Sequence, residues 1–330
     1  MSVIEQLLRL RRDGAELRPF CRSAGVRHRS YSGRLQRVLT DFGAEASFGR
    51  AVGRVQEHYG IAVPVEAVRQ HTLRHGKAIA GLIPTAPKVP AKTLITQMDG
   101  SMIPIMQPGS GEDARKGRQL FWREARLCCA GMEGKASPLY GATLGGVETA
   151  SLLWRQTAQA AGLGERTHVH GVGDGATWIV NQFTENFGDQ GRYLLDFYHV
   201  SHYLAAAAQT IKPKKPQEWL HHQQGRLLEN KSAGVLRALK AHIESEETTE
   251  HPVRAAYEYL HARRDQLDYA TARTRKLPIG SGQIESGHRH IIQQRLKLAG
   301  CWWKETHAQH MLTLRTARAN NLWNIYWSKN

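Results

Sequence analysis

The sequence has little cysteine, and its cysteines do not predict a metal site or a disulfide framework. Only four occur in 330 residues: Cys21, Cys128, Cys129 and Cys301. They form no Cys-x-x-Cys pair, and adjacent cysteines can bridge each other only under strain. We therefore exclude a zinc ribbon and a disulfide scaffold, expect no zinc, and interpret the thiols as buried and unreactive.

Long hydrophobic runs are also missing. No apolar segment approaches the roughly 18 residues that are read as a membrane-spanning helix. The start of the sequence, "MSVIEQLLRLRRDG", has no apolar core followed by a cleavage site. We therefore expect no membrane partner and a cytoplasmic location.

Acidic residues are scarce relative to basic ones. Lys and Arg number 45 against 29 Asp and Glu, a formal net charge of +16, and the basic residues recur along the whole chain. This balance favours a polyanionic partner, nucleic acid first, because Lys and Arg contacts to phosphates supply most non-specific affinity. A basic enzyme without such a partner is the alternative. The hydrophobic fraction of 41% is enough for a substantial core.

The N-terminal region, residues 1–83, is predicted to be helical. The segment "SFGRAVGRVQEHYG" has apolar residues at helical spacing and ends at Gly60, and "PVEAVRQHTLRHGKAIA" begins a second helix. Two short helices around a tight turn suggest a helix-turn-helix, in which Arg69, Gln70 and Arg74 would face a DNA groove. An ordinary helical hairpin with a solvated basic face is the alternative.

The remaining chain predicts a mixed α/β layer with a helical insertion. Residues 84–93, "PTAPKVPAKT", contain three prolines and are interpreted as a linker. Residues 94–204 then alternate strand-like and helical segments: "TLITQMDG", "SMIPIMQ", "GRQLFWREARLCCA", "ETASLLWRQTAQAAG", "THVHGVGD", "GATWIVNQFTENFG" and "RYLLDF". Residues 205–276 are predicted to be an all-helical insertion, and 277–330 the closing helices, including one over "AQHMLTLRTARANNLWNIYW".

Three carboxylates occur where elements are predicted to meet loops. Asp99 ends "TLITQMDG", Asp174 ends "THVHGVGD", and Glu285 follows "LPIGSGQ" in the first turns of a helix. At about 100° per residue, Glu285 falls between Ile292 and Leu296, on the flank of the apolar stripe. A carboxylate there needs a metal, an arginine or N–H donors.

Each carboxylate also has a simpler interpretation. Asp-Gly is a common turn dipeptide, and Glu285 can be a first-turn acid near the helix dipole with Gly282 as the N-cap. Hard ions such as Mg²⁺ or Mn²⁺ prefer convergent carboxylate oxygens. Two ions held by three such groups would clamp the oxygens of a phosphodiester displacement.

The segment "GVGDGA", residues 171–176, supports a rival hypothesis. It satisfies the G-x-G-x-x-A dinucleotide fingerprint between a strand and a helix, and Asp196 ends the next strand. Against a dinucleotide-dependent enzyme, Asp174 would repel a pyrophosphate at the helix N-terminus, and no second βαβ half follows.

Six longer strings carry a family resemblance: "MDGSMIPI", "FWREARLC", "HVHGVGDGATWI", "YLLDFYHVSHYL", "LPIGSGQIES" and "RLKLAGCWW". Together they resemble the ISKra-type bacterial insertion-sequence transposases, related to the Mutator-like group, from about residue 38 to the C-terminus. The resemblance implies an RNase H-like core, interrupted by a helical insertion, whose DDE triad binds two divalent ions. By motif the triad would be Asp99, Asp174 and Glu285.

The resemblance also implies a D-x-x-H motif, here Asp196 and His199. These two could position a DNA strand, or Asp196 could cap a helix while His199 packs. Family members often begin with a cysteine-rich segment, whereas this sequence has only Cys21 before residue 128.

Four further residues are candidates for contacts near the site. Trp302 and Trp303 could stack on a base or belong to the core. His288 and Arg289 could approach a phosphate beside the metals or hold Glu285 in an ion pair.

The sequence therefore predicts a DNA transposase that hydrolyses phosphodiesters at transposon ends and transfers strands into target DNA. Its expected partners are terminal inverted repeats, target DNA and further copies of itself in a homodimer or larger assembly, in the nucleoid of a bacterial cytoplasm. A metal-dependent nuclease without strand transfer and a non-catalytic DNA-binding protein are the alternatives.

Overall fold

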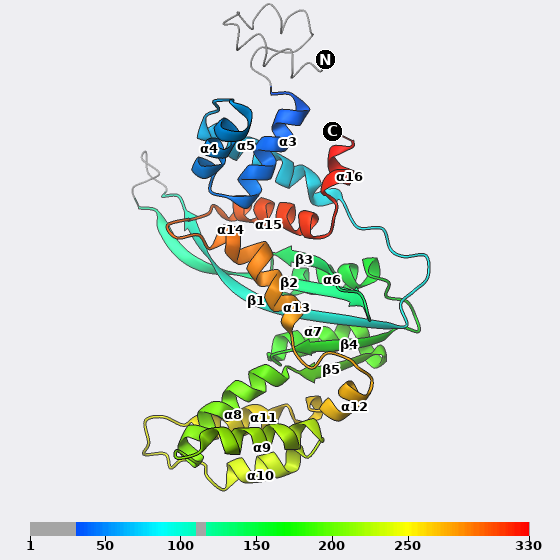
Figure 1. The fold of residues 1–330 in the computed structure, drawn as a ribbon, viewed down its shortest axis with the longest axis vertical. Coiled ribbons are helices and arrows are strands. Elements are labelled where there is room, and N and C mark those ends of the chain that lie inside the picture. Colours follow the sequence, from blue (N-terminus) through cyan, green and yellow to red (C-terminus); the bar gives the residue numbers. More distant parts are fainter. Residues whose placement is uncertain (1–30, 110–116, 330) are drawn as a thin grey trace, which may run out of the picture.

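The computed structural model describes residues 31–109 and 117–329, which extend along one axis (Figure 1). N-terminal helices form one end, a sheet lies in the middle, and a group of helices forms the other end. Cys21 and the start of the chain, with the expectations about them, lie outside the described residues. No helix in the described ranges is long and apolar enough to cross a membrane.

The central sheet has five strands in the order β3-β2-β1-β4-β5. They are β1 (Thr93–Gln107), β2 (Gln119–Met132), β3 (Leu139–Thr143), β4 (His168–Gly173) and β5 (Gly191–Leu195). Strand β2 is antiparallel to both of its neighbours, while β4 and β5 run parallel to β1. This order and polarity are those of an RNase H-like sheet and confirm the predicted α/β class.

Two details of the sheet differ from the sequence prediction. The segments "TLITQMDG" and "SMIPIMQ" form one long strand, because Asp99 and Gly100 continue the pairing with Leu127 and Arg126. Asp99 therefore lies inside β1 and not at its end. The short strand β3 was not predicted.

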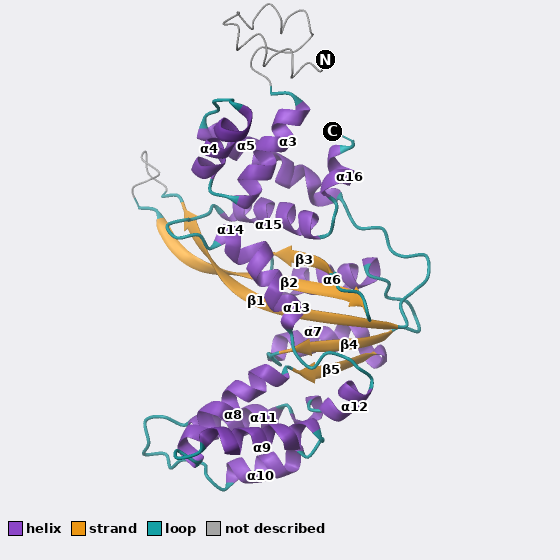
Figure 2. Cartoon of the chain, viewed as in Figure 1, coloured by secondary structure: helices purple, strands orange, loops and turns teal. Residues whose placement is uncertain are grey.

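Helices cover both faces of the sheet (Figure 2). On one face α6 (Val147–Ala160) and α7 (Thr177–Phe187) bury Trp154 against Phe183 and Phe187. On the other face lie α13 (Gly282–Gly287), the π-helical turn η4 (His288–Gln293), α14 (Gln294–Leu296) and α15 (Glu305–Ala319). Their apolar side chains form one core with β1 and β2.

The N-terminal helices are α3 (Gly33–Glu45), α4 (Phe48–Tyr59) and α5 (Val65–Ala78), followed by the 3₁₀ turn η1 (Ile79–Gly81). As predicted, α4 ends at Gly60, whose left-handed conformation favours glycine. The fully buried Arg295 joins these helices to the core. Its Nε donates to the Gly43 carbonyl at 3.0 Å, its guanidinium lies over Phe48 and Trp303, and burial lowers its pKa to about 10.

The predicted C-terminal helix is interrupted. Helix α15 ends at Ala319, Asn321 takes a positive φ of 59°, and the short α16 (Trp323–Trp327) follows. A left-handed residue cannot continue an α-helix, so one continuous helix over "AQHMLTLRTARANNLWNIYW" was wrong.

Beyond β5 the chain forms a helical layer with its own core. It contains α8 (Phe197–Ile211), α9 (Pro216–Leu228), α10 (Ser232–Lys240), α11 (Pro252–Ala262) and α12 (Tyr269–Thr274), with the 3₁₀ turn η3 (Arg264–Gln266). Another 3₁₀ turn, η2 (Gly188–Gln190), precedes β5. Buried leucines such as Leu204, Leu227 and Leu260 hold the layer together. Helices follow β5 directly, beginning with α8 at Phe197, eight residues before the predicted start of the insertion at 205.

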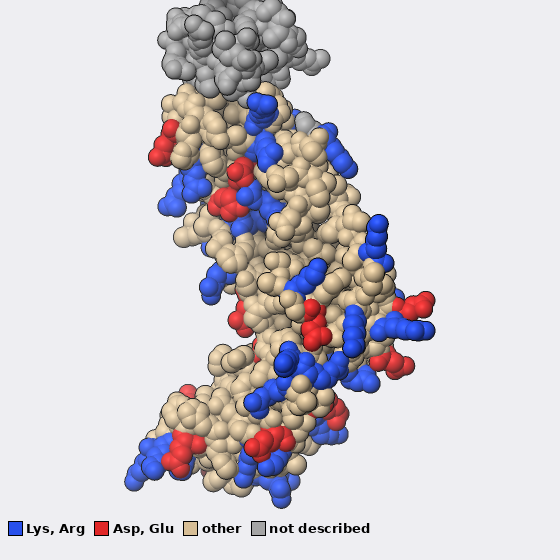
Figure 3. Space-filling model, turned by 45° about the vertical axis from the view of Figure 1, so that its right-hand side comes forward, with Lys and Arg blue, Asp and Glu red and all other residues tan. Residues whose placement is uncertain are grey.

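The described cysteines are free thiols that are buried or partly buried, and basic side chains are spread over the surface, as the composition predicted. Cys128 and Cys129 are buried free thiols, and desolvation raises the pKa of Cys128 to about 12, which makes it a poor nucleophile. Cys301 is partly buried. Figure 3 shows Lys and Arg side chains spread from the N-terminal helices to the helical layer, with fewer Asp and Glu among them.

Candidate functional site

Asp99 lies in β1, and Asp174 directly follows the neighbouring parallel strand β4. The β1–β4 pairing ends with Thr96 opposite Gly171, and the same register continued by three residues would set Asp99 opposite Asp174. A Cβ at Gly173 would lie 3.8 Å from the Met98 carbonyl oxygen, so the residues just before the two aspartates are close. Both carboxylates act on Tyr193: burial raises the pKa of its hydroxyl, and the negative charges of Asp174 and Asp99 raise it further. Both aspartates are half-buried, so the edge that they share is accessible to a ligand.

The loop that carries Asp174 is held by the helical layer. The Asp174 Oδ1 accepts from the Ala176 amide at 2.9 Å, and its carbonyl accepts from the Tyr259 hydroxyl at 2.5 Å. Arg263 Nε donates to the carbonyl of Gly175 at 2.8 Å, and its guanidinium lies 4.3 Å from the Tyr259 ring centre. Helix α11 thus fixes the backbone on both sides of the Asp174–Gly175 peptide bond.

Removing this support should have a measurable cost. Tyr259→Phe deletes the hydroxyl that binds the Asp174 carbonyl, and we expect the free energy of unfolding to fall by about 1 kcal/mol. Denaturant unfolding measures the change. Tyr257→Phe on the same helix is the control, because the ring of Tyr257 stacks on His261. Equal effects of the two substitutions would contradict a specific role for the Tyr259 hydroxyl.

Asp196 is buried after the end of β5 and forms hydrogen bonds that link this region to the helix of Glu285. Its Oδ1 accepts from the amides of Tyr198 at 2.6 Å and His199 at 3.2 Å, which caps α8. Its Oδ2 accepts from the Ser281 amide at 2.8 Å and from the Ser281 hydroxyl. The structure therefore shows the capping role that the sequence left open, together with a link to α13 that the sequence did not predict.

His199 packs against aromatic rings of the helical layer. Its ring lies 5.6 Å from those of Tyr203 and Tyr259, and Tyr203 stacks on Tyr259 at 4.2 Å. In this arrangement it supports the same tyrosine that holds the Asp174 loop.

Helix α13 is held against the sheet by β1. Gln97 Oε1 accepts from the Ile284 amide at 2.8 Å, and a Cβ at Gly287 would lie 2.6 Å from the Tyr140 ring. Only glycine allows so close an approach. Gly282 does not act as the N-cap, which is Ser281, and the Ser281 hydroxyl bonds Asp196 instead of capping the helix.

The expectation that Glu285 lies on the flank of the apolar stripe was wrong, because its side chain is exposed. The helical-wheel argument assumed one continuous α-helix, whereas α13 passes into a π-helical turn after six residues. The apolar stripe to which Ile292 and Leu296 belong is buried, as predicted.

His288 approaches the first aspartate and not the glutamate. Its Nε2 lies 3.1 Å from Asp99 Oδ2, and the histidine is 5% exposed. Arg289 is exposed, and neither residue forms an ion pair with Glu285 within the described ranges. The sequence predicted that His288 lies near the proposed metal site. It gave no signal that Asp99, 189 positions earlier, is the residue that His288 contacts.

The three acids do not form a closed metal cage. In residues 31–109 and 117–329, no group of three or more His, Cys, Asp and Glu side chains is arranged to hold a metal ion. Mg²⁺ usually binds one or two carboxylates and completes its shell with water and substrate phosphates. Half-buried carboxylates at an open edge fit that mode, so these residues are compatible with a hard divalent ion.

Residues predicted to contact DNA through the N-terminal helices line a basic groove. Arg69, Gln70 and Arg74 of α5 share a hollow of about 430 Å³ with Lys77 and with His307 and His310 of α15. The two helices cross closely, since a Cβ at Gly76 would lie 2.5 Å from the His310 carbonyl oxygen. Helix α5 therefore packs on the core instead of standing free, which the helix-turn-helix interpretation did not foresee.

Of the two neighbouring tryptophans, Trp303 lies in the core and Trp302 lies at the surface. Trp303 is 4% exposed, with its Nε1 bonded to the Leu296 carbonyl, so its ring is enclosed and not available to stack on a base in this conformation. Trp302 is 41% exposed and lies 6.3 Å from the ring of Trp122, which is also exposed.

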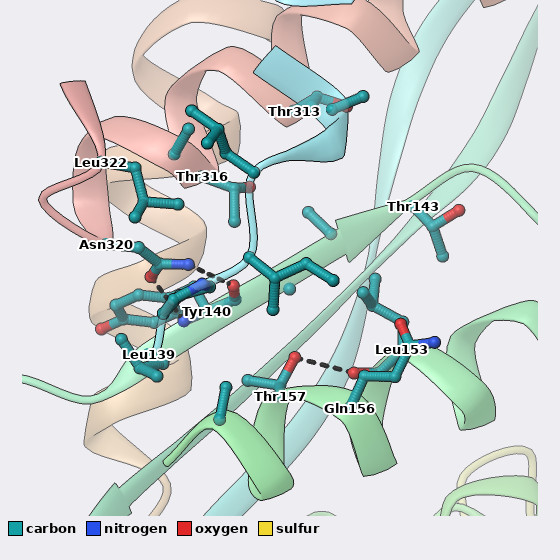
Figure 4. A pocket seen from close by; sticks show the side chains of 18 of the residues that line it. Leu139, Tyr140, Thr143, Leu153, Gln156, Thr157, Thr313, Thr316, Asn320 and Leu322 are labelled. Carbon is teal, nitrogen blue, oxygen red and sulfur yellow. Dashed lines mark hydrogen bonds between the residues drawn. The ribbon is translucent and has the colours of Figure 1, made fainter. Parts of the chain in front are cut away.

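A second cavity, of about 470 Å³, lies between β3, α6 and α15 (Figure 4). Its lining contains no charged side chain, and Asn320 closes one side by exchanging hydrogen bonds with the backbone of Tyr140.

The glycine-rich segment is not arranged as a dinucleotide loop. Gly171 and Gly173 lie within β4, packed against Phe183 and Tyr193, and the Ala176 amide is already bonded to Asp174. A pyrophosphate at this helix start would meet a carboxylate, which disfavours the rival hypothesis.

Comparisons with known proteins give one family match and a distant structural similarity. Residues 163–327 match the model of the "Uncharacterised protein family (UPF0236)". No curated protein matches the chain. One similar solved structure is a Drosophila P element transposase strand transfer complex, with 11% identity over 99% of this chain and 87% of that chain, and a TM-score of 0.32. A similarity this weak says nothing about activity.

Proposed function

This chain belongs to the UPF0236 family, and we propose that it is a DNA transposase acting through Asp99, Asp174 and Glu285. The observation that supports the proposal is the register of β1 and β4, which would set Asp99 opposite Asp174 if it continued past Thr96 and Gly171. The helix of Glu285 is tied to the same sheet by hydrogen bonds from its first residues to Asp196 and Gln97.

The three carboxylates would hold two Mg²⁺ or Mn²⁺ ions. When bound, such ions lower the pKa of an attacking water or hydroxyl and neutralise charge on the phosphoryl group. The protein positions the acids: Tyr259 and Arg263 fix the loop of Asp174, and β1 fixes Asp99. Glu285 is exposed and therefore able to reach substrate from the solvent side.

The proposed reaction has two steps at one site. Hydrolysis of a phosphodiester at the end of the element frees a 3′-hydroxyl, and that hydroxyl then attacks target DNA. The resemblance of "MDGSMIPI", "HVHGVGDGATWI" and "LPIGSGQIES" to ISKra-type transposases supports strand transfer over simple hydrolysis. A homodimer or larger assembly on DNA is part of the proposal.

The direct test uses duplexes from the ends of the element that encodes the chain, incubated with Mg²⁺ or Mn²⁺. We expect strand cleavage, joining to a second duplex, and loss of both in excess chelator. Cleavage without joining would favour a nuclease. DNA binding without either reaction would favour a non-catalytic DNA-binding protein.

The groove between α5 and α15 should contribute to DNA affinity. Lys77 is exposed and has no acidic partner in the described part of the chain, whereas Arg69 is paired with Glu66. For Lys77→Gln we expect weaker binding and a salt dependence, log Kd against log salt, that is shallower by about 1. Lys240→Gln, on exposed α10, is the control. An unchanged slope for Lys77→Gln would remove the groove from the proposed interface.

A further inference from the structure

The ring of His288 is buried without the hydrogen bonds that a buried imidazole normally makes. The residue is 5% exposed, and within the described chain neither Nδ1 nor Nε2 has a hydrogen-bond partner. An unpaired buried ring nitrogen is costly, and native structures contain few of them. An ordered water or a bound ion can supply the partner that the described protein groups do not.

The position of Nε2 indicates what this partner is. Nε2 lies 3.1 Å from Asp99 Oδ2, but the two groups are not at hydrogen-bonding angles. Two neighbouring ligands of an octahedral ion, each at about 2.1 Å from the metal, lie about 3.0 Å apart. The spacing of the imidazole nitrogen and the carboxylate oxygen is thus compatible with two ligands of one ion as well as with an ion pair.

His288 follows Glu285 by three positions, where α13 passes into a π-helical turn. Glu285 is exposed, whereas His288 is buried. His288 opens the π-helical turn His288–Gln293, and π-helical turns occur frequently at functional sites. Gly287, immediately before it, brings the backbone against Tyr140 and Leu127, which places His288 over the strand of Asp99.

We propose that His288 is a direct ligand of a divalent metal ion shared with Asp99, so that the centre contains nitrogen as well as oxygen donors. This inference rests on the proposed function for the location of the centre. Nε2 would bind the ion while Nδ1 keeps its proton. Mg²⁺ is bound in proteins by carboxylates, waters and phosphates, and an imidazole ligand is less suited to it than to the softer Mn²⁺, so the site should favour Mn²⁺ over Mg²⁺.

The alternative is that His288 only positions Asp99, as an ion-pair partner that never touches the metal. The two roles differ in one observable, which is magnetic coupling between a bound Mn²⁺ and an imidazole nitrogen. That coupling is measured by pulsed electron paramagnetic resonance of the full-length protein with Mn²⁺ alone, without DNA and without turnover.

We expect coupling to ¹⁴N in the wild-type protein and its replacement by a ¹⁵N signal when the histidines carry ¹⁵N. His288→Gln should abolish the coupling and weaken Mn²⁺ binding by about tenfold or more, the scale seen when groups supporting a metal ligand are removed. The control is His290→Gln, two residues away and exposed, which should keep both. Because the isotope experiment needs no substitution, it stands even if His288→Gln does not fold.

Two results would overturn the inference: bound Mn²⁺ with no histidine coupling in the wild-type protein, or coupling that survives His288→Gln. Absence of Mn²⁺ binding would overturn both this inference and the proposed metal centre. Coupling in a protein that does not cleave or join DNA would support the inference while contradicting the proposed transposase activity, so the two failures are distinguishable.

Discussion

Asp174→Asn is expected to reduce cleavage of an end-containing duplex by about 10³-fold, comparable to the loss of one group that stabilises a developing charge. The amide keeps the shape of the side chain and can still accept the Ala176 hydrogen bond through its oxygen. It removes the negative charge that would hold an ion beside Asp99. Folding should therefore be retained while the reaction is lost.

The measurement is the single-turnover cleavage rate in Mg²⁺ and in Mn²⁺, with DNA affinity measured separately. Asp189→Asn, an exposed aspartate in the turn before β5, is the control and should cleave at the wild-type rate. If Asp174→Asn cleaves as fast as the control, Asp174 has no part in catalysis.

The second large effect concerns stability. Asp196→Ala removes the acceptor of four hydrogen bonds, two from the first turn of α8 and two from Ser281. The residue is 3% exposed, and the two Ser281 donors stay buried when the carboxylate is removed. A lost helix cap costs about 1 kcal/mol and further buried bonds to a charged group about 1 kcal/mol or more each, which gives a total of about 3–4 kcal/mol.

Asp268→Ala is the matched comparison, because Asp268 also caps a helix, α12, but from an exposed position. We expect it to cost about 1 kcal/mol in the same denaturant experiment. Asp196→Ala should in addition impair cleavage, because the helix of Glu285 loses its link to β5. Equal losses of stability for the two substitutions would show that the bonds to Ser281 contribute little.

The sheet and the aspartates were predictable because they depend on local patterns. The short segments "THVHGVGD" and "RYLLDF" mark β4 and β5, and Asp174 and Asp196 follow these strands directly. Asp99 was also identified, although its strand was misjudged: Asp-Gly usually ends a strand, but here Gly100 makes room for the side chain of Glu124 on β2. Pairing with a neighbouring strand overrode the local turn preference.

The details around Glu285 were not predictable, for two physical reasons. A π-helical turn changes the angle between successive side chains, so a wheel drawn at α-helical spacing misplaces Glu285. The contacts Asp99–His288 and Asp196–Ser281 join residues far apart in sequence, and no spacing rule connects them. The same holds for Lys77, His307 and His310, which share a groove only because α5 crosses α15.

The central claim is that Asp99, Asp174 and Glu285 bind the same metal centre. The most direct measurement is a crystal structure of the full-length protein on a transposon-end duplex with Mn²⁺, located by its anomalous scattering. We predict Mn²⁺ within about 2.0–2.3 Å of carboxylate oxygens from all three residues, with a DNA phosphate in the same coordination sphere. Mn²⁺ bound elsewhere, or no Mn²⁺ at this edge of the sheet while DNA is engaged, would contradict it.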